Sequence, residues 1–360
     1  MKIRNFGIAA IAGASAFIAA SAVAVAQEAN ADIGADIRPM CGDRPIKIGL
    51  TDGYGGDTWR AISRAEFRDE AAKCPNITDV IYMDAGGDQQ KYNGDIDSLV
   101  AQGVGVIVTF TDFGEASIPA YRSAMQDGVV VVPYFSALKG EAGRDFSANI
   151  YIDQKASGKL WADWYGKNLR EGNLIFFGGF AGATSSAAFL DGLKEGLKQY
   201  PGLKLLDDNF VTTNWSATDA QKATSGVIAQ YPDIDGIVTD YGVTAAAVVR
   251  TYQQAGLKVP AIATVASNNE LNCMYIKDKQ AGSGWSYFSI DGLNRLDRYA
   301  LRKGLSLALG TPNDESNAVI FHPFADSYAG LDPKCDPAAP LDADLSSSLS
   351  KDALYSIFKK

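Results

Sequence analysis

Short apolar runs alternate with longer amphipathic stretches along most of the chain, and this alternation limits the possible folds more than any other feature. The runs predict strands at Ile46–Thr51, Val80–Met83, Gly105–Phe110, Val129–Tyr134, Leu174–Phe177, Leu203–Phe210, Gly236–Thr239 and Ala261–Val265. The stretches between them predict helices, among them Tyr92–Gln102, Ser117–Asp127, Gln154–Leu169, Ser186–Tyr200, Ala217–Gln230 and Thr244–Ala255. Such a βα rhythm is typical of an α/β protein with parallel sheets that carry helices on both faces.

The rhythm is interrupted once, at residues 135–153, where the sequence becomes polar and irregular before a second βα series begins. We interpret this interruption as the crossing from one lobe to another. The tail at residues 332–350 is rich in Pro, Asp and Ser and is predicted to be a surface extension.

The N-terminus has the pattern of a secretory signal peptide. Lys2 and Arg4 precede an uncharged run over residues 5–26, which ends in Ala24-Val25-Ala26. The alternative is a membrane anchor, because the run is just long enough to span a bilayer. Cleavage near Ala26 predicts an exported, soluble protein in the periplasm.

The mature chain is acidic. Removal of residues 1–26 takes away two basic residues and changes the net charge from −9 to −11. This charge argues against a nucleic-acid partner. The remaining length suits two domains within one chain.

Four cysteines in an oxidising compartment predict disulfides. Cys41 precedes the first strand and Cys74 follows the first helix, so both lie at the same end of that βα unit. We favour Cys41 with Cys74 and Cys273 with Cys335. Free buried thiols are the alternative.

Residues typical of catalysis or metal binding are scarce. The single histidine, His322, excludes a histidine-rich metal site and is expected to be structural. A glycine-rich turn at residues 178–185 could donate N–H groups to a ligand oxygen, but its spacing does not fit a dinucleotide loop. We therefore predict no cofactor, no metal and no enzymatic activity, although a pair of carboxylates remains possible because spatial pairing is invisible in the sequence.

Aromatic and polar residues recur where the predicted strands end. Trp59 begins the helix after the first strand, behind Asp57 or Thr58 as its cap. In open parallel sheets ligands bind beyond the carboxyl ends of the strands. Rings that can stack on pyranose C–H faces, together with polar neighbours, suit a sugar. Other residues of this kind at strand ends are Asp52, Tyr54, Asp112, Phe135, Asp240 and Tyr241.

The layout from about Pro45 to Leu331 resembles the type I periplasmic sugar-binding proteins of ABC transporters, the group of ribose-, galactose- and galactofuranose-binding receptors. The resemblance rests on Trp59-Arg60-Ala61, on SLVAQGVGVIV at residues 98–108 and on the turn at residues 179–185. It rests also on Tyr231-Pro232-Asp233 before IDGIVTD and on Gln254-Ala255-Gly256.

The resemblance implies two Rossmann-like lobes joined by three crossing strands. The implied boundaries are 45–151 plus 288–317 for the N-terminal lobe, 152–287 plus 318–331 for the C-terminal lobe and 332–360 for a C-terminal extension. It also implies a ligand clamped between the lobes by hinge closure. The implied ligand-binding residues beyond the strand-end set are Trp59, Arg60, Asp153, Gln154, Asn214, Trp215, Ser267 and Tyr287.

Several positions depart from the family pattern. Phe135 and Ser136 stand where ribose-type receptors have Asp and Arg, and Ala187 stands where a second-lobe helix offers Arg. Ala266-Ser267-Asn268 replaces a Gly-Phe-Asp turn. Loss of a forked guanidinium removes bidentate recognition of hydroxyls. These departures indicate a ligand that is larger, less hydroxylated or recognised through Asn, Ser and Tyr.

The function predicted from these observations is a monomeric solute receptor that captures a small carbohydrate-like ligand and delivers it to an inner-membrane ABC permease. One alternative is a ligand-sensing receptor for a chemoreceptor or a kinase. Another is a secreted hydrolase that uses a carboxylate pair. Amino acids, nucleosides and furanosyl signals are further ligand classes of the same fold.

Overall fold

The computed structural model describes Met1 and residues 34–359, and all the secondary structure given below lies in the second of these ranges. The predicted signal peptide at residues 1–26 lies outside the described residues, apart from Met1. None of the helices in the described part is long and apolar enough to cross a membrane.

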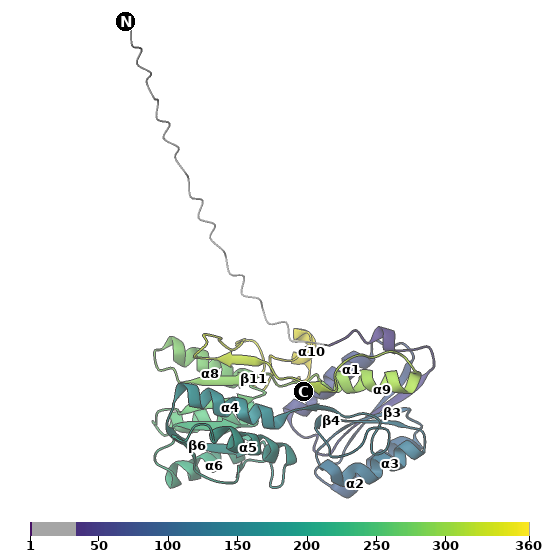
Figure 1. Ribbon diagram of the computed structural model, residues 1–360, viewed down its shortest axis with the longest axis horizontal. Coiled ribbons are helices and arrows are strands. Elements are labelled where there is room, and N and C mark those ends of the chain that lie inside the picture. Colours follow the sequence, from purple (N-terminus) through teal and green to yellow (C-terminus); the bar gives the residue numbers. More distant parts are fainter. Residues whose placement is uncertain (2–33, 360) are drawn as a thin grey trace. The chain divides into compact units, whose positions relative to one another are not determined.

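Six strands, five of them from the first half of the chain, form a parallel sheet in the order β12-β5-β4-β3-β1-β2. Two of them, β3 and β4, are labelled in Figure 1. Its strands are β1 Ile46–Asp52, β2 Ile77–Asp84, β3 Val106–Phe110, β4 Val130–Ser136, β5 Ile150–Ile152 and β12 Ala318–Val319. Its helices are α1 Thr58–Ala71, α2 Gln89–Ala101, α3 Ile118–Gln126 and α9 Leu296–Leu309, with short 3₁₀ turns η1 Arg38–Met40 and η2 Gly114–Ser117. We call this sheet with its helices the first lobe.

A second sheet has the order β13-β11-β10-β9-β6-β7, with β8 paired to β6. Its strands are β6 Gly172–Gly178, β7 Leu203–Leu205, β8 Val211–Thr212, β9 Gly236–Thr239, β10 Ala261–Val265, β11 Tyr287–Ile290 and the antiparallel β13 Pro323–Asp326. Its helices are α4 Gln154–Asn168, α5 Thr184–Leu197, α6 Ala217–Gln230, α7 Gly242–Gln254 and α8 Asn269–Gln280. This sheet with its helices is the second lobe, so the predicted fold class of two parallel-sheet α/β lobes is confirmed.

The central strands of both sheets are buried throughout because helices cover both of their faces. Every residue of β3 is buried, and so is every residue of β9 and β10. In the first lobe β1 lies between β2 and β3, with Leu50 opposite Tyr82 on one side and Val108 on the other. The parallel pairing brings the carboxyl ends of these strands to one edge of the sheet.

Of the strand predicted at Leu203–Phe210, the first three residues form β7, and residues 206–210 are irregular and lead to the separate short strand β8. The Asp207 carboxylate accepts a hydrogen bond from the backbone N–H of Asn209 at 2.8 Å. Asp and Asn side chains that bond to the nearby backbone favour turns, and this turn interrupts the strand.

Strand pairing places the crossings between the lobes a few residues from the predicted boundaries. β5 stays in the first sheet through Ile152, and β11 stays in the second sheet through Ile290. β12 at Ala318–Val319 pairs with β5 in the first sheet, although residues 318–331 were predicted to belong to the C-terminal lobe. Only β13 within that range joins the second sheet.

The predicted disulfides, Cys41–Cys74 and Cys273–Cys335, are confirmed, with Cα atoms 5.3 and 5.0 Å apart. The first closes the βα unit made by β1 and α1. The second attaches the C-terminal segment, residues 332–359, to α8.

This C-terminal segment is more than the surface extension predicted from its composition, because it packs against both lobes. On the second lobe, the backbone N–H of Asn269 donates to the Ala343 carbonyl at 2.8 Å. On the first lobe, the Glu66 carboxylate accepts from the Ser347 hydroxyl at 2.6 Å and from the Ser348 N–H at 2.7 Å. Between them, the Ser346 hydroxyl accepts from the Gly292 N–H at 2.9 Å.

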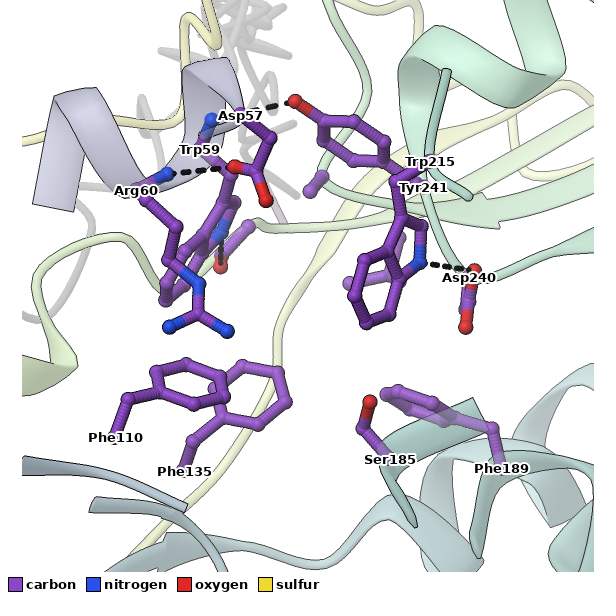
Figure 2. A pocket seen from close by; sticks show the side chains of 13 residues that line it. Asp57, Trp59, Arg60, Phe110, Phe135, Ser185, Phe189, Trp215, Asp240 and Tyr241 are labelled. Carbon is purple, nitrogen blue, oxygen red and sulfur yellow. Dashed lines mark hydrogen bonds between the residues drawn. The ribbon is translucent and has the colours of Figure 1, made fainter. Parts of the chain in front are cut away.

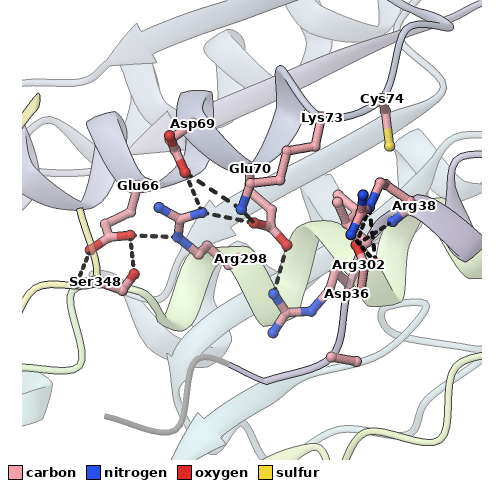
Figure 3. Close-up of polar contacts among 12 residues, drawn as sticks. Asp36, Arg38, Glu66, Asp69, Glu70, Lys73, Cys74, Arg298, Arg302 and Ser348 are labelled. Carbon is pink, nitrogen blue, oxygen red and sulfur yellow. Dashed lines mark hydrogen bonds and ion pairs between the residues drawn. The ribbon is translucent and has the colours of Figure 1, made fainter. Parts of the chain in front are cut away.

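Glu66 belongs to a buried ionic cluster between α1 and α9 (Figure 3). Arg298 reaches Glu66 and Glu70, and Arg302 reaches Glu70 at 2.7 Å. Each of these charges is buried with an opposite partner, which is the condition under which burial of ionic groups is tolerated. The cluster holds α1, whose second residue is Trp59, against α9.

The apolar side of the C-terminal segment gives a stability test. Leu354 in α10 Lys351–Ser356 is 4% exposed and packs in one cluster with Ile62 of α1. We expect Leu354→Ala to lower the free energy of unfolding by about 2–3 kcal/mol, since it removes buried methyl groups and leaves a cavity. Urea unfolding monitored by circular dichroism measures the change.

Leu341→Ala is the matched control in the same segment, because that side chain is 64% exposed. Its effect is expected to stay within about 0.5 kcal/mol of zero. Equal effects of the two substitutions would show that the segment does not pack as described.

Candidate functional site

A pocket lies where the carboxyl ends of strands from both sheets meet (Figure 2). Residues from both lobes line it. They are Asp57, Trp59, Arg60, Phe110, Phe135, Ser185, Phe189, Trp215, Asp240, Tyr241, Val265, Ala266 and Gly292.

Trp59 is placed by the start of α1. The Asp57 side chain caps this helix by accepting from the Arg60 N–H at 2.8 Å. The Trp59 indole N–H donates to the Gly292 carbonyl at 2.7 Å, and its backbone N–H donates to the Tyr241 hydroxyl at 3.2 Å. Trp59 is therefore bonded both to the chain that follows β11 and to the second lobe, and it is only 8% exposed.

Two phenylalanine rings complete the first-lobe wall. Phe110 ends β3, and Phe135 is near the end of β4. The two rings stack with centroids 4.6 Å apart, and each meets Trp59 edge-on at 5.7 and 5.4 Å. Edge-to-face and stacked contacts of this kind hold rings in fixed orientations.

Arg60 brings a guanidinium group to this wall. Its Nη1 bonds the Asp52 carboxylate at 3.0 Å, and its Nη2 bonds the Asp112 carboxylate at 2.8 Å. Its Cζ lies 3.2 Å from the Phe110 ring centroid, a cation–π contact. Burial lowers the pKa of Arg60, but the two carboxylates outweigh burial and raise it, so the group stays charged.

The second-lobe wall is built around Trp215 and Asp240. The Trp215 indole N–H donates to the Asp240 carboxylate at 3.0 Å, and the Ser186 hydroxyl donates to the other oxygen of Asp240. The Trp215 ring packs directly on Gly179, where any side chain would collide with it. Burial raises the pKa of Asp240 to about 6, although both hydrogen bonds lower it.

Three pocket residues have backbone conformations that are unusual for residues other than glycine. The φ angles are 96° at Phe135, 51° at Trp215 and 51° at Ala266. Positive φ at such residues costs about 1–3 kcal/mol each and is concentrated at functional sites. The strain is consistent with rings and backbone that are held in place for binding.

Six of the fourteen predicted binding residues line the pocket: Trp59, Arg60, Phe135, Trp215, Asp240 and Tyr241. Asp52 and Asp112 lie behind Arg60 and hold it. Tyr54 lies beside the second-lobe rings, with its centroid 5.7 Å from Phe180 and 6.2 Å from Trp215.

The other five predicted residues are not among those that line the pocket. Asp153 caps α4, Asn214 is exposed and bonds Asp219, and Ser267 is buried next to Ala266. Gln154 donates to the Ser136 hydroxyl at 2.9 Å, near the first crossing.

Tyr287 was predicted near a hinge amide, but its hydroxyl donates to Asn272 at 2.9 Å inside the second lobe. The residue points away from the crossing because β11 alternates its side chains between the two faces of the sheet.

Sequence reasoning missed seven lining residues: Asp57, Phe110, Ser185, Phe189, Val265, Ala266 and Gly292. Asp57 was predicted only as a helix cap, and Ser185 only as part of a possible oxygen-binding turn. Counting from the strand at residues 174–177 led to Ala187, which is exposed, whereas Phe189 on the same helix faces the pocket. Gly292 has no local sequence signal, since only the chain crossing brings it to Trp59.

The raised pKa of Asp240 predicts a pH effect on stability. Between pH 3.8 and about 6 the native state keeps a proton that the unfolded chain has released, so the free energy of unfolding falls as pH rises through this window. Asp240→Asn removes this effect. The quantity to follow is the free energy of unfolding of the variant minus that of the original protein. We expect this difference to increase by about 2–3 kcal/mol from pH 4 to pH 7.

Urea unfolding at several pH values measures this difference, with Asp208→Asn as control because the Asp208 side chain is 97% exposed. The control is expected to run parallel to the original protein. A constant offset for Asp240→Asn over the whole pH range would contradict the raised pKa.

Residues 48–289, more than half of the chain, match a family model described as a periplasmic binding protein domain. A xylitol-binding protein from Mycolicibacterium smegmatis is 26% identical over 205 residues, which are 55% of this chain and 56% of the relative. The D-xylose-binding periplasmic protein of Escherichia coli is 25% identical over 182 residues, 49% of this chain and 54% of the relative. The chain thus spans about half the length of the curated relatives it matches.

A solved structure with the same fold is an ABC transporter solute-binding protein from Burkholderia graminis in complex with D-arabinose. The TM-score is 0.68 at 16% identity, and the match covers 81% of this chain and 99% of that chain. The likeness supports the two-lobed type I fold. With the match to the family model over residues 48–289, it follows that this chain belongs to the periplasmic binding protein family.

Proposed function

We propose that this protein is the solute-binding receptor of an ABC transporter and that it captures a small, carbohydrate-like ligand between its two lobes. The observation that carries the proposal is a pocket walled by Trp59, Phe110 and Phe135 from the first lobe and by Phe189 and Trp215 from the second. Flat aromatic faces on both sides suit the C–H faces of a sugar ring. The names of the two curated relatives, which bind xylitol and D-xylose, support a ligand of about five carbons.

Polar groups at the same walls would orient such a ligand. Asp57 and Arg60 lie on the first lobe, and Ser185, Asp240 and Tyr241 lie on the second. Carboxylates accept from hydroxyls, and serine or tyrosine hydroxyls both donate and accept. The pocket therefore combines stacking surface with a small number of directional contacts, as small-molecule sites usually do.

Ligand capture is proposed to work by a population shift. A ligand that contacts both lobes binds the closed arrangement better than an open one, and it shifts the equilibrium by this difference in affinity. The hydrogen bond from the Trp59 backbone N–H to the Tyr241 hydroxyl joins the two lobes in this closed arrangement. The closed form would then be the form that an inner-membrane permease recognises.

The periplasm is the proposed location, in agreement with the family and with the signal-like sequence at residues 1–26. The proposed role is binding and release without chemical change of the ligand. Delivery to the permease is the proposed use of the bound state.

The proposal is tested by calorimetric titration of the mature protein with xylitol, D-xylose and D-arabinose. We expect at least one of them to bind, and Trp59→Ala to weaken that binding at least tenfold, because it removes a stacking ring whose contact contributes on the order of 1 kcal/mol beyond buried area. It also removes the hydrogen bond from the indole N–H to the Gly292 carbonyl, which holds the ring in place.

Trp285→Ala is the matched control, since Trp285 is also a buried tryptophan but packs with Tyr275 and Tyr287 inside the second lobe. It is expected to lower stability and leave affinity within twofold. Absence of binding by the whole panel would overturn the proposed sugar receptor, and unchanged affinity in Trp59→Ala would remove that ring from the site.

A further inference from the structure

The polar side chains on the first-lobe wall of the pocket are already engaged within the protein. Both terminal nitrogens of Arg60 hold carboxylates, those of Asp52 and Asp112, at 3.0 and 2.8 Å. Asp57 Oδ1 accepts from the backbone N–H of Arg60 at 2.8 Å. What this wall still offers a ligand is the second oxygen of Asp57 and the Arg60 N–H groups that do not bond the two carboxylates.

The second-lobe wall is similar. One Asp240 oxygen accepts from Trp215 and the other from Ser186. The Tyr241 hydroxyl accepts from the Trp59 N–H at 3.2 Å, although its own proton can still be donated. Ser185 is the remaining hydroxyl on the lining.

The rest of the lining is apolar. The phenyl rings of Phe110, Phe135 and Phe189 carry no polar atom, and Val265 and Ala266 add aliphatic surface to the lining. Phe110 and Phe135 present a continuous stacked surface, with centroids 4.6 Å apart. A hydroxyl turned toward these rings would lose its bonds to water and gain none in return.

The charge balance of the lining favours a neutral ligand. Among the described residues that line the pocket, Arg60 is the one with a positive charge, and two carboxylates already neutralise it. Asp57 and Asp240 are acidic, and burial raises the pKa of both. A sugar acid or a sugar phosphate would find no uncompensated cation here, and its own charge would be costly to bury.

From these contacts we propose that the pocket selects a neutral sugar or polyol in which at least one hydroxyl is replaced by hydrogen or is alkylated on its oxygen, a deoxy or alkylated sugar. This proposal rests on the proposed receptor function and narrows its ligand class. The replaced position faces the Phe110 and Phe135 rings. The remaining hydroxyls contact Ser185, Asp240 and Tyr241.

The preference follows from the cost of an unpaired polar group. A buried hydroxyl without a partner is strongly unfavourable, whereas hydrogen or methyl at the same position gains apolar contact. Discrimination of this kind comes from the site's inability to satisfy the extra group, and not from a new attraction. We therefore expect a deoxy or alkylated compound to bind at least tenfold more tightly than its fully hydroxylated parent.

Calorimetric titration of the mature protein with matched pairs tests the preference. The pairs are 2-deoxy-D-ribose with D-ribose, methyl β-D-xyloside with D-xylose, and L-fucose with L-galactose, which differ only in one substituent. The expected result is a tighter Kd for the first member of at least one pair, by tenfold or more, with no pair reversed. Parents that bind as tightly as their partners, or more tightly, would overturn the proposal and leave the receptor function intact.

No binding by any member of any pair, parents included, would overturn the receptor function and this proposal together. D-xylonate serves as the charged comparison with D-xylose. It is expected to bind at least tenfold more weakly than the neutral sugar, and tighter binding of the acid would contradict the neutral-ligand part of the proposal.

A pair of variants at Phe135 locates the selecting surface. Phe135→Asn places an amide on this wall, and asparagine tolerates the positive φ found there better than most residues. Phe135→Leu removes the ring without adding a polar group. We expect both variants to bind more weakly than the original protein. Phe135→Asn is expected to reduce the preference for the deoxy or alkylated member at least fivefold, whereas Phe135→Leu is expected to keep that preference.

Thermal unfolding of both variants verifies that they fold. An equal preference in the two variants would show that the Phe135 wall does not select the ligand. The matched pairs measured on the unaltered protein decide the main proposal even if one variant fails to fold.

Discussion

The Arg60 guanidinium, held between two carboxylates and a phenyl ring, is the interaction on which the first-lobe side of the pocket depends. It joins the end of β1 through Asp52, the loop after β3 through Asp112 and the start of α1. Asp112 also accepts from the backbone N–H groups of Gly53 and Tyr54 at 2.8 and 3.1 Å. Because Arg60 is only 3% exposed, loss of either carboxylate would leave a poorly compensated buried charge, and breaking such pairs is strongly destabilising. One ion cluster thus fixes the end of β1, the start of α1 and the loop after β3 at one edge of the sheet.

Much of the fold could be predicted from the sequence because it depends on local patterns. Apolar runs predicted most of the strands, and the position of the cysteines around one βα unit predicted the first disulfide. Strand-end residues, the start of the first helix and the family resemblance together predicted six of the thirteen residues that line the pocket. The early end of the strand predicted at Leu203–Phe210 and the pairing of β12 with β5 were missed. Both depend on turn bonding and on partners distant in sequence, which periodicity does not report.

The site was harder to predict than the fold, and the misses have physical causes. Phe189 and Gly292 reach the pocket only through helix rotation and chain crossing, so no neighbouring residue indicates their role. Tyr287 looked favourable in the sequence, but the strand turns its side chain into the second-lobe core. The carboxylates of Asp52 and Asp112 were predicted to bind ligand, and in the structure they hold the buried guanidinium of Arg60. Strand ends therefore predict where a pocket forms more reliably than which atoms remain available in it.

The C-terminal segment limits how far the two lobes can separate. Ala343 is bonded to Asn269 on one lobe and Ser347 to Glu66 on the other, with three residues between these anchors. A fully extended chain gains at most about 3.3–3.6 Å per residue, so the anchors cannot part by more than about 14 Å while both bonds hold. Opening beyond that length has to release one anchor, and the disulfide at Cys335 keeps the segment on the second lobe. On the first lobe the segment is held by Glu66 and also by the packing of Leu354 against Ile62. The segment is therefore a tether whose length sets the largest separation of the lobes that is reachable without local unpacking.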